Sequence, residues 1–175
     1  MNLFITPHPP IILSEIGKGE EEKAGKTIAG MKKIAKAISA IKPKTIALIT
    51  PHGNVFRDAL CINTEVALKG DFGNFGYSNL SYEFSGSDKA KTICDELNKI
   101  GITCVELNNK TADQYNVSTK IDHGALVPLY FIMQEYTDFD LVHINMGFLS
   151  KTQLYKSCKI ISDILGEENV LIASG

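Results

Sequence analysis

Two short segments of the sequence end in the same Pro-His step. The first reads LFITPHPPIIL and carries His8, and the second reads IALITPHGNVF and carries His52. Each step follows an apolar run, and proline stiffens the backbone around itself. Two neutral imidazoles that converge in one cleft are a natural start for a metal site. The repeat therefore predicts that His8 and His52 bind one ion, although a single histidine at a strand end is more often a surface or hydrogen-bonded residue.

Two further histidines complete the set of four. His123 lies in KIDHGALVPLYF, at the expected start of an apolar helix, where the helix dipole favours a neutral ring. A neutral imidazole can take or give a proton, so His123 is a candidate acid–base residue; the alternative is a helix-terminal residue without a chemical task. His143, in LVHINM, lies inside an expected strand, and we interpret it as a hydrogen-bonded core or rim histidine.

The elements that must position these side chains alternate between strands and helices. Continuous apolar runs predict core strands covered on both faces, at residues 3–6, 45–50, 141–146 and 170–173, with 102–107 as a fifth candidate. Apolar residues at steps of three and four predict helices at residues 24–41, 88–100, 123–136 and 151–165. Residues 58–84 alternate polar and apolar around GDFGNFG, which predicts a short antiparallel excursion with two strands.

This alternation is typical of an α/β fold with three layers, in which helices cover both faces of a mixed, mostly parallel sheet. Functional groups in such folds gather beyond the carboxyl ends of the strands, where His8 and His52 both fall. Residues 71–77 contain aromatic residues and glycines. We interpret them as a surface loop, with the lining or covering of a pocket as the alternative.

Composition limits the class of protein. A chain of 175 residues with 44% hydrophobic residues fits one globular domain with a sizeable core. A net charge of −2, with Arg57 as the sole arginine, argues against a nucleic-acid partner. No apolar stretch reaches the length of a membrane span, and prolines interrupt the N-terminal apolar run, so we expect no membrane partner and no signal peptide.

The four cysteines have no CxxC spacing. In a chain of this size, that pattern predicts reduced, mostly buried thiols. Together with the absence of a signal peptide pattern, it predicts a cytoplasmic location.

Three motifs together carry a resemblance to a known family. TPHPP near the N-terminus, TPHGNVF after the second expected strand and DHGALVPL beyond the middle resemble the LigB-like family of class III extradiol ring-cleavage dioxygenases. The order and the separations of the motifs also match, and the resemblance covers all 175 residues. The sequence is most similar to the branch linked to AMMECR-type domains, with the Memo proteins as more distant relatives.

The resemblance implies iron chemistry at three residues. His8 and His52 match the two histidine ligands of a non-haem Fe(II), and His123 matches the acid–base histidine beside the substrate. Family members open a catechol-like ring next to its two hydroxyls with O₂. Two histidines and a carboxylate on one face of the iron leave adjacent positions open for both reactants.

The family's third ligand is a carboxylate from the C-terminal part of the domain. This chain ends at Gly175, before a matching segment. We therefore expect residues 1–175 to form a single LigB-like domain that lacks its C-terminal part, either as a fragment or as a shortened relative, and that is inactive by itself. Glu15 and Asp122 are the acids nearest to the motif histidines, but neither matches the ligand position.

Two other functions stay open. The fold could serve binding without catalysis, as in the Memo branch, or the histidines could hold Zn²⁺ in a hydrolase. The presence of His123 favours an enzyme, whereas the missing third ligand favours a binding protein. The expected partners are a catechol-like aromatic substrate and O₂, with a homo-oligomer or an AMMECR-type domain as further candidates.

Overall fold

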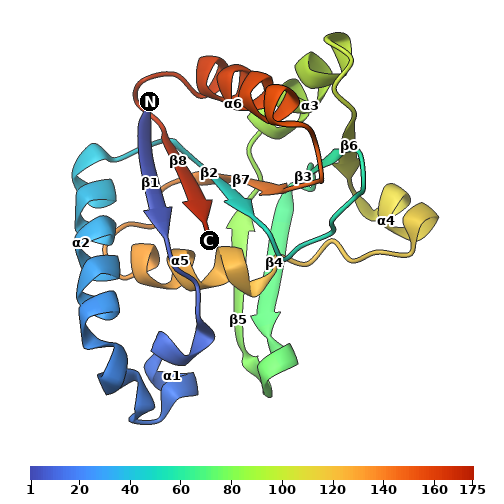
Figure 1. The fold of residues 1–175 in the computed structure, drawn as a ribbon. Coiled ribbons are helices and arrows are strands. Elements are labelled where there is room, and N and C mark those ends of the chain that lie inside the picture. The colour runs from blue at the N-terminus through green and yellow to red at the C-terminus, as the bar shows by residue number, and fades with distance from the viewer.

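A six-stranded sheet runs through the centre of the computed structural model, which describes residues 1–175 (Figure 1). Its spatial order is β1-β8-β2-β7-β3-β6. The strands are β1 (Asn2–Thr6), β2 (Thr45–Thr50), β3 (Leu60–Asn63), β6 (Cys104–Leu107), β7 (Asp140–Asn145) and β8 (Val170–Ser174). The first four in space run parallel, and β3 is antiparallel to β7. The expected mixed, mostly parallel sheet is confirmed, and so are its five expected strands.

Helices cover both faces of the sheet. One face carries α2 (Gly25–Ile41) and α5 (His123–Met133), and the other carries α3 (Lys89–Lys99) and α6 (Lys151–Leu165) (Figure 1). The shorter elements are α1 (Ser14–Gly17), α4 (Asn109–Tyr115) and the 3₁₀ turns Pro10–Ile12, Glu20–Ala24 and Gly73–Phe75. All four expected long helices are confirmed. None of the helices is both long and apolar enough to cross a bilayer.

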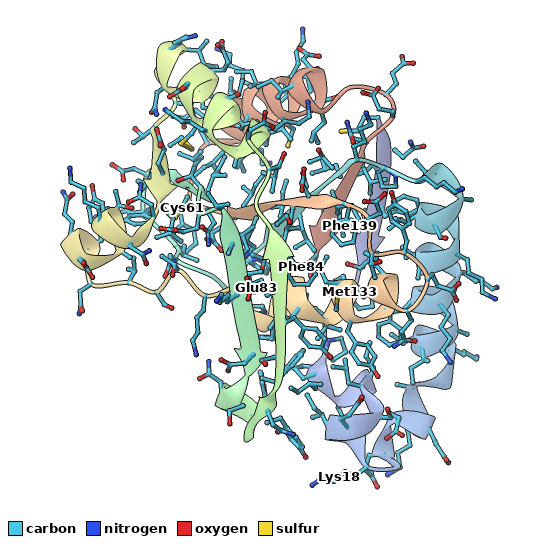
Figure 2. All side chains as sticks on the ribbon, turned by 180° about the vertical axis from the view of Figure 1, so that it is seen from behind. Lys18, Cys61, Glu83, Phe84, Met133 and Phe139 are labelled. Carbon is cyan, nitrogen blue, oxygen red and sulfur yellow. A yellow bond between two sulfur atoms is a disulfide. The ribbon has the colours of Figure 1, made fainter.

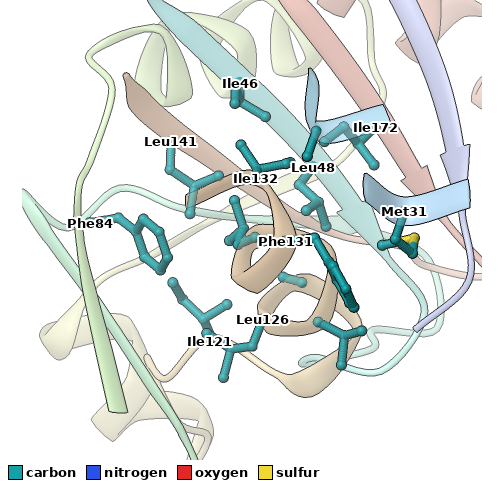
Figure 3. Close-up of a cluster of buried hydrophobic side chains, with 14 of the residues drawn as sticks. Met31, Ile46, Leu48, Phe84, Ile121, Leu126, Phe131, Ile132, Leu141 and Ile172 are labelled. Carbon is teal, nitrogen blue, oxygen red and sulfur yellow. The ribbon is translucent and has the colours of Figure 1, made fainter. Parts of the chain in front are cut away.

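Two apolar cores hold the layers together. The larger one lies between the sheet and the α2/α5 layer, where Leu48, Leu126 and Ile172 meet (Figure 3). The other lies beneath α3 and α6 and includes Ile93 and Ile144. Because α5 is apolar around nearly its whole circumference, it is the most deeply buried helix, whereas His123 at its start is only partly buried.

An antiparallel hairpin projects from the sheet and consists of β4 (Ala67–Phe72) and β5 (Tyr77–Ser85). Phe84 near its base packs against Phe139, which precedes β7 (Figure 2). The expected excursion at residues 58–84 is therefore confirmed, but its start is corrected. Residues 60–63 form β3 in the main sheet, where the apolar Leu60, Cys61 and Ile62 and the polar Asn63 are all buried.

Strand β1 differs from the expectation of burial on both faces. It is an edge strand, and Leu3 and Ile5 are 58% and 74% exposed. Phe4, on the opposite face, packs against the larger core. The expectation was wrong for one face, because the layer formed by α3 and α6 does not reach as far as β1.

The expectation of four reduced cysteines was also wrong. Cys94 of α3 and Cys104 of β6 form a disulfide. The turn at Gly101 folds β6 back against the helix, so that the two Cα atoms lie 5.3 Å apart. Cys61 and Cys158 are free thiols, and burial raises the pKa of Cys61 to about 11.

Candidate metal and catalytic site

His8 and His52 meet at the carboxyl edge of the sheet. His8 follows β1 and His52 follows β2, and β8 lies between these two strands. The Nε2 atoms of the two rings are 2.8 Å apart. Two nitrogens that each lie about 2.1 Å from one shared ion would be separated by roughly 3 Å, so this spacing fits a common ligand position.

His123 joins them from the first residue of α5. Its ring stacks on that of His52, with centroids 4.5 Å apart. One ring nitrogen from each histidine can be chosen so that all three lie within 4.8 Å of one another. We call His8, His52 and His123 the histidine group, and it could hold a metal ion. All three residues singled out from the sequence are thus brought together.

Two rings of the histidine group favour the neutral form. Burial, followed by the neighbouring His52, lowers the pKa of both His8 and His123 below the usual 6.5. Asp122 acts in the opposite direction on both rings, but it does not outweigh the other causes. Neutral imidazole is the form that binds a metal or accepts a proton, so these two rings suit either task.

Asp122 connects the loops of the site through hydrogen bonds. Its Oδ1 accepts hydrogen bonds from Thr50 Oγ1 at 2.7 Å and from the backbone N–H of Gly124 at 2.8 Å. The backbone N–H of His52 in turn donates to Thr50 Oγ1 at 3.2 Å. Asp122 is therefore the N-cap of α5, and it also anchors the segment that carries His52.

His143 provides the other partner of Asp122. Its Nε2 lies 3.0 Å from Asp122 Oδ2, and its side chain is completely buried. Burial alone would raise the pKa of Asp122, but the bonds from His143, Thr50 and Gly124 lower it to about 2. His143 is thus a hydrogen-bonded core histidine, as expected. Asp122 places a negative charge beneath the histidine group.

Neither acid near the motifs lies in the histidine group, which contains no carboxylate. The Glu15 carboxylate accepts from Tyr130 Oη at 2.9 Å, and Ser14 also contacts it. Asp122 is committed to the three donors described above. The expectation that neither acid is a metal ligand stays a prediction.

Two glycines permit the close packing of the site. A Cβ atom on Gly53 would overlap the amide oxygen of Asn145, and one on Gly124 would overlap Thr50 Oγ1. The glycines of PHG and DHG therefore allow the backbone to approach its neighbours, and any larger residue would move His52 or His123.

A cavity of about 420 Å³ opens beside the histidine group, and His52 and His123 form part of its wall. The hairpin contributes Phe75, whose ring meets that of His123 edge-on with centroids 5.0 Å apart. Lys120 and Asp71 also line the cavity and form a salt bridge of 2.7 Å. Residues 71–77 lie at the exposed tip of the hairpin, and the alternative interpretation also applies, because Asp71 and Phe75 line the cavity although Phe75 is 40% exposed.

A larger hollow of about 680 Å³ lies between Lys42, Ser85 and Asp140. It contains no histidine and lies at the amino ends of β2 and β7. In α/β folds, ligands bind beyond the carboxyl ends of the strands, which is the opposite edge of the sheet. We therefore assign the cavity beside His123 as the candidate binding site.

An α/β sheet with convergent histidines at its carboxyl edge and an adjoining cavity is the arrangement of a domain that could hold a metal ion beside a small ligand. Comparison with known families makes this more specific. The family described as the catalytic LigB subunit of aromatic ring-opening dioxygenase matches residues 2–175. The chain therefore belongs to the LigB family, and the resemblance inferred from the three motifs is confirmed.

A curated relative is Protein CA_C1420 of Clostridium acetobutylicum. The two sequences are 37% identical over an alignment of 177 residues, which includes 98% of this chain. The chain spans only 38% of the length of that protein.

Proposed function

We propose that this chain carries the metal-binding and acid–base residues of an extradiol-type dioxygenase, which opens a catechol-like ring with O₂. The observation that carries the proposal is the convergence of His8, His52 and His123 beside a cavity in a LigB-family chain.

His8 and His52 would hold Fe(II) through their Nε2 atoms. Bound Fe(II) would bring the two substrate oxygens and O₂ together for reaction. A carboxylate from outside residues 1–175 would complete the ligand set, as the family resemblance implies. Asp122 contributes negative charge from beneath the site and would offset part of the charge of the cation.

His123 would accept a proton from a substrate hydroxyl and return it later in the reaction. Its lowered pKa keeps the ring neutral and ready to accept. The ring faces the cavity and is held between the stacked His52 and the edge-on Phe75. This packing restricts the ring to one orientation toward the bound substrate.

The cavity would take the aromatic ring beside Phe75. Its volume suits a single small aromatic molecule, and Phe75 offers an apolar edge. Lys120 and Asp71 stand at the wall, where substituents on the substrate would contact them.

The test is anaerobic loading with Fe(II), followed by addition of protocatechuate, catechol or 3,4-dihydroxyphenylalanine in air. The absorbance of the yellow ring-opened product reports turnover. Residues 1–175 and a chain extended beyond Gly175 are compared. Turnover by the longer chain alone would support a ligand from outside residues 1–175. Turnover by residues 1–175 would show that an acid among them completes the site. Iron binding without product in either chain would refute the proposal.

A zinc-dependent hydrolase is a second candidate, and one observation favours it. Three histidines without a carboxylate match the three-histidine ligand set of some catalytic zinc sites. In that case His123 would be a ligand and not an acid–base residue. Zinc content and hydrolysis of an activated ester distinguish the two candidates, because only the zinc enzyme would hydrolyse the ester without O₂.

The assembly of the protein stays a prediction. We propose an AMMECR-type domain or a second copy of the chain as a partner, on the basis of the family branch that the motifs resemble. Size-exclusion chromatography with light scattering would distinguish a monomer from an oligomer.

A further inference from the structure

Ser174 lies at the end of β8, between the strands that deliver His8 and His52 (Figure 1). Its side chain is nearly buried, with 8% exposure. The hydroxyl has two neighbours. Its Oγ lies 2.6 Å from the carbonyl oxygen of Gly124 and 2.7 Å from Nδ1 of His8. Ser174 therefore connects α5 with the first histidine of the site.

The carbonyl of Gly124 can receive this bond because of Pro128. In an α-helix, the carbonyl of residue 124 accepts from the N–H of residue 128. Proline has no N–H, and Pro128 stands inside α5. The backbone thus leaves Gly124 without its usual partner, and the Ser174 hydroxyl takes that place.

The two contacts of Ser174 determine where the protons lie. A carbonyl oxygen can only accept, so the single hydroxyl proton of Ser174 points to Gly124. The Ser174 oxygen then has only lone pairs to offer to His8. The 2.7 Å contact is a hydrogen bond only if Nδ1 of His8 carries the proton and donates it.

We propose that Ser174 is a positioning residue that holds His8 in the Nδ1–H tautomer, with the bare Nε2 directed at His52. The proposal deepens the proposed function, since it concerns the same metal site, but it applies to whichever divalent ion binds there. The tautomer leaves the Nε2 lone pair free for the ion, and the hydrogen bond fixes the plane of the ring. Partners of this kind typically alter metal affinity by about 10–100-fold.

The first experiment reads the tautomer directly in the metal-free protein. Long-range proton–nitrogen correlation spectra of protein with ¹⁵N-labelled histidine distinguish a protonated from a bare ring nitrogen. The measurement is made well above the pKa of His8, and the His8→Gln variant assigns the signal. We expect protonated Nδ1 and bare Nε2 at His8 in the wild type. A His8 ring with protonated Nε2 would overturn the proposal.

Substitutions then test the cause. Ser174→Ala should convert His8 to a mixture of tautomers and weaken Zn²⁺ binding by about 10-fold or more in calorimetric titration. Ser174→Thr retains a hydroxyl and should restore both the tautomer and most of the affinity. Ser157→Ala is the matched control, because Ser157 is also buried and donates to the carbonyl of Gln153, far from any histidine.

Unchanged tautomer and unchanged zinc affinity in Ser174→Ala would overturn the proposal. If Ser174→Ala does not fold, the wild-type spectrum and the Ser174→Thr variant still decide it. The tautomer is read without metal, substrate or O₂. A protein that fails to open aromatic rings would therefore refute the proposed reaction and leave the tautomer result intact.

Discussion

The Nε2 atoms of His8 and His52 lie 2.8 Å apart although their strands are not neighbours. Strand β8 separates β1 from β2, so each Pro-His step reaches over the end of β8 toward the other. The closeness of the two rings helps to keep His8 neutral, because His52 adds to burial in lowering the pKa of His8. The repeated Pro-His step thus brings two ring nitrogens from separated strands to one point, where they could bind a metal ion.

Replacement of either Pro-His histidine should abolish tight metal binding. His8→Gln and His52→Gln each remove one of two adjoining nitrogens, and a single imidazole retains a divalent ion only weakly. Metal content after purification without chelator, measured by mass spectrometry, checks this. Tyr155→Ala, on the exposed side of α6, is the control and should match the wild type. Equal metal content in all four proteins would contradict the assignment.

Replacement of His123 should lower the turnover number but leave iron binding unchanged. In an active form of the domain, His123→Ala should lower kcat by about two to four orders of magnitude, because a positioned acid–base group is lost. Iron content should remain near that of the wild type. Steady-state kinetics and metal analysis are measured together. Loss of the metal would instead identify His123 as a third ligand and favour the zinc candidate.

Asp122→Asn should destabilise the fold. The substitution removes the charge that His143, Thr50 and Gly124 surround, and an amide cannot accept from all three donors. We expect a loss of about 1–3 kcal/mol in the free energy of unfolding, measured by urea denaturation. Asp163→Asn, on the exposed surface of α6, is the control. Equal stability of the two variants would show that the Asp122 network contributes little.

Gly53→Ala should weaken metal binding through the backbone. The added methyl overlaps Asn145, which is fully buried and cannot move away easily, so the turn that carries His52 must shift. Zinc titration should show lower affinity together with lower thermal stability. Gly30→Ala is a matched control inside α2, where a methyl meets nothing. It should stabilise the protein by about 0.5–1 kcal/mol. Wild-type affinity in Gly53→Ala would contradict the role of this contact.

The metal-free protein should lose stability as the pH falls below about 6.5. His8 and His123 have pKa values below this unfolded-state value, so the unfolded chain binds more protons in that window. The free energy of unfolding therefore rises with pH until the unfolded histidines are neutral. Denaturation at several pH values checks the slope. The double variant His8→Gln, His123→Gln should show a flatter profile, and an identical profile would contradict the assigned pKa shifts.

Much of the fold could be predicted because its strands and helices have distinct apolar patterns. Strand β2 matches the expected residues 45–50, and α6 matches 151–165, since each has clear apolar periodicity and clear ends. Strand β3 was placed in the excursion, because its short apolar run stood next to the glycine-rich hairpin. Helix α4 was missed since it spans only two turns and is stabilised by a capping box at Asn108 and not by an apolar stripe.

The sequence could predict those site residues that directly follow a strand or occupy the first position of a helix. His8, His52 and His123 satisfy that rule, and they converge. Ser174 satisfies it too, because it directly follows the strand expected at 170–173, but serine alone carries no chemical signature. Phe75 was assigned to a surface loop, since nothing in a local sequence pattern determines which way a hairpin tip bends.

The disulfide and the exposed face of β1 depend on contacts between distant elements. Cys94 and Cys104 meet because the chain reverses at Gly101, which spacing rules for metal or redox motifs do not cover. Leu3 and Ile5 belong to an apolar run like that of β2, but burial depends on the extent of the neighbouring helices. Sequence periodicity describes one element at a time and does not specify these relationships.

The position of β8 sets the order in which the site can be assembled during synthesis. Strand β1 is made before β2, yet its partner in the sheet is β8, with Asn2 aligned to Val170. Pairing over so long a sequence separation is slow and waits until β8 has emerged from the ribosome. His8 and His52 therefore stay apart on the nascent chain. The pair that could capture a metal forms only at the step that closes the sheet.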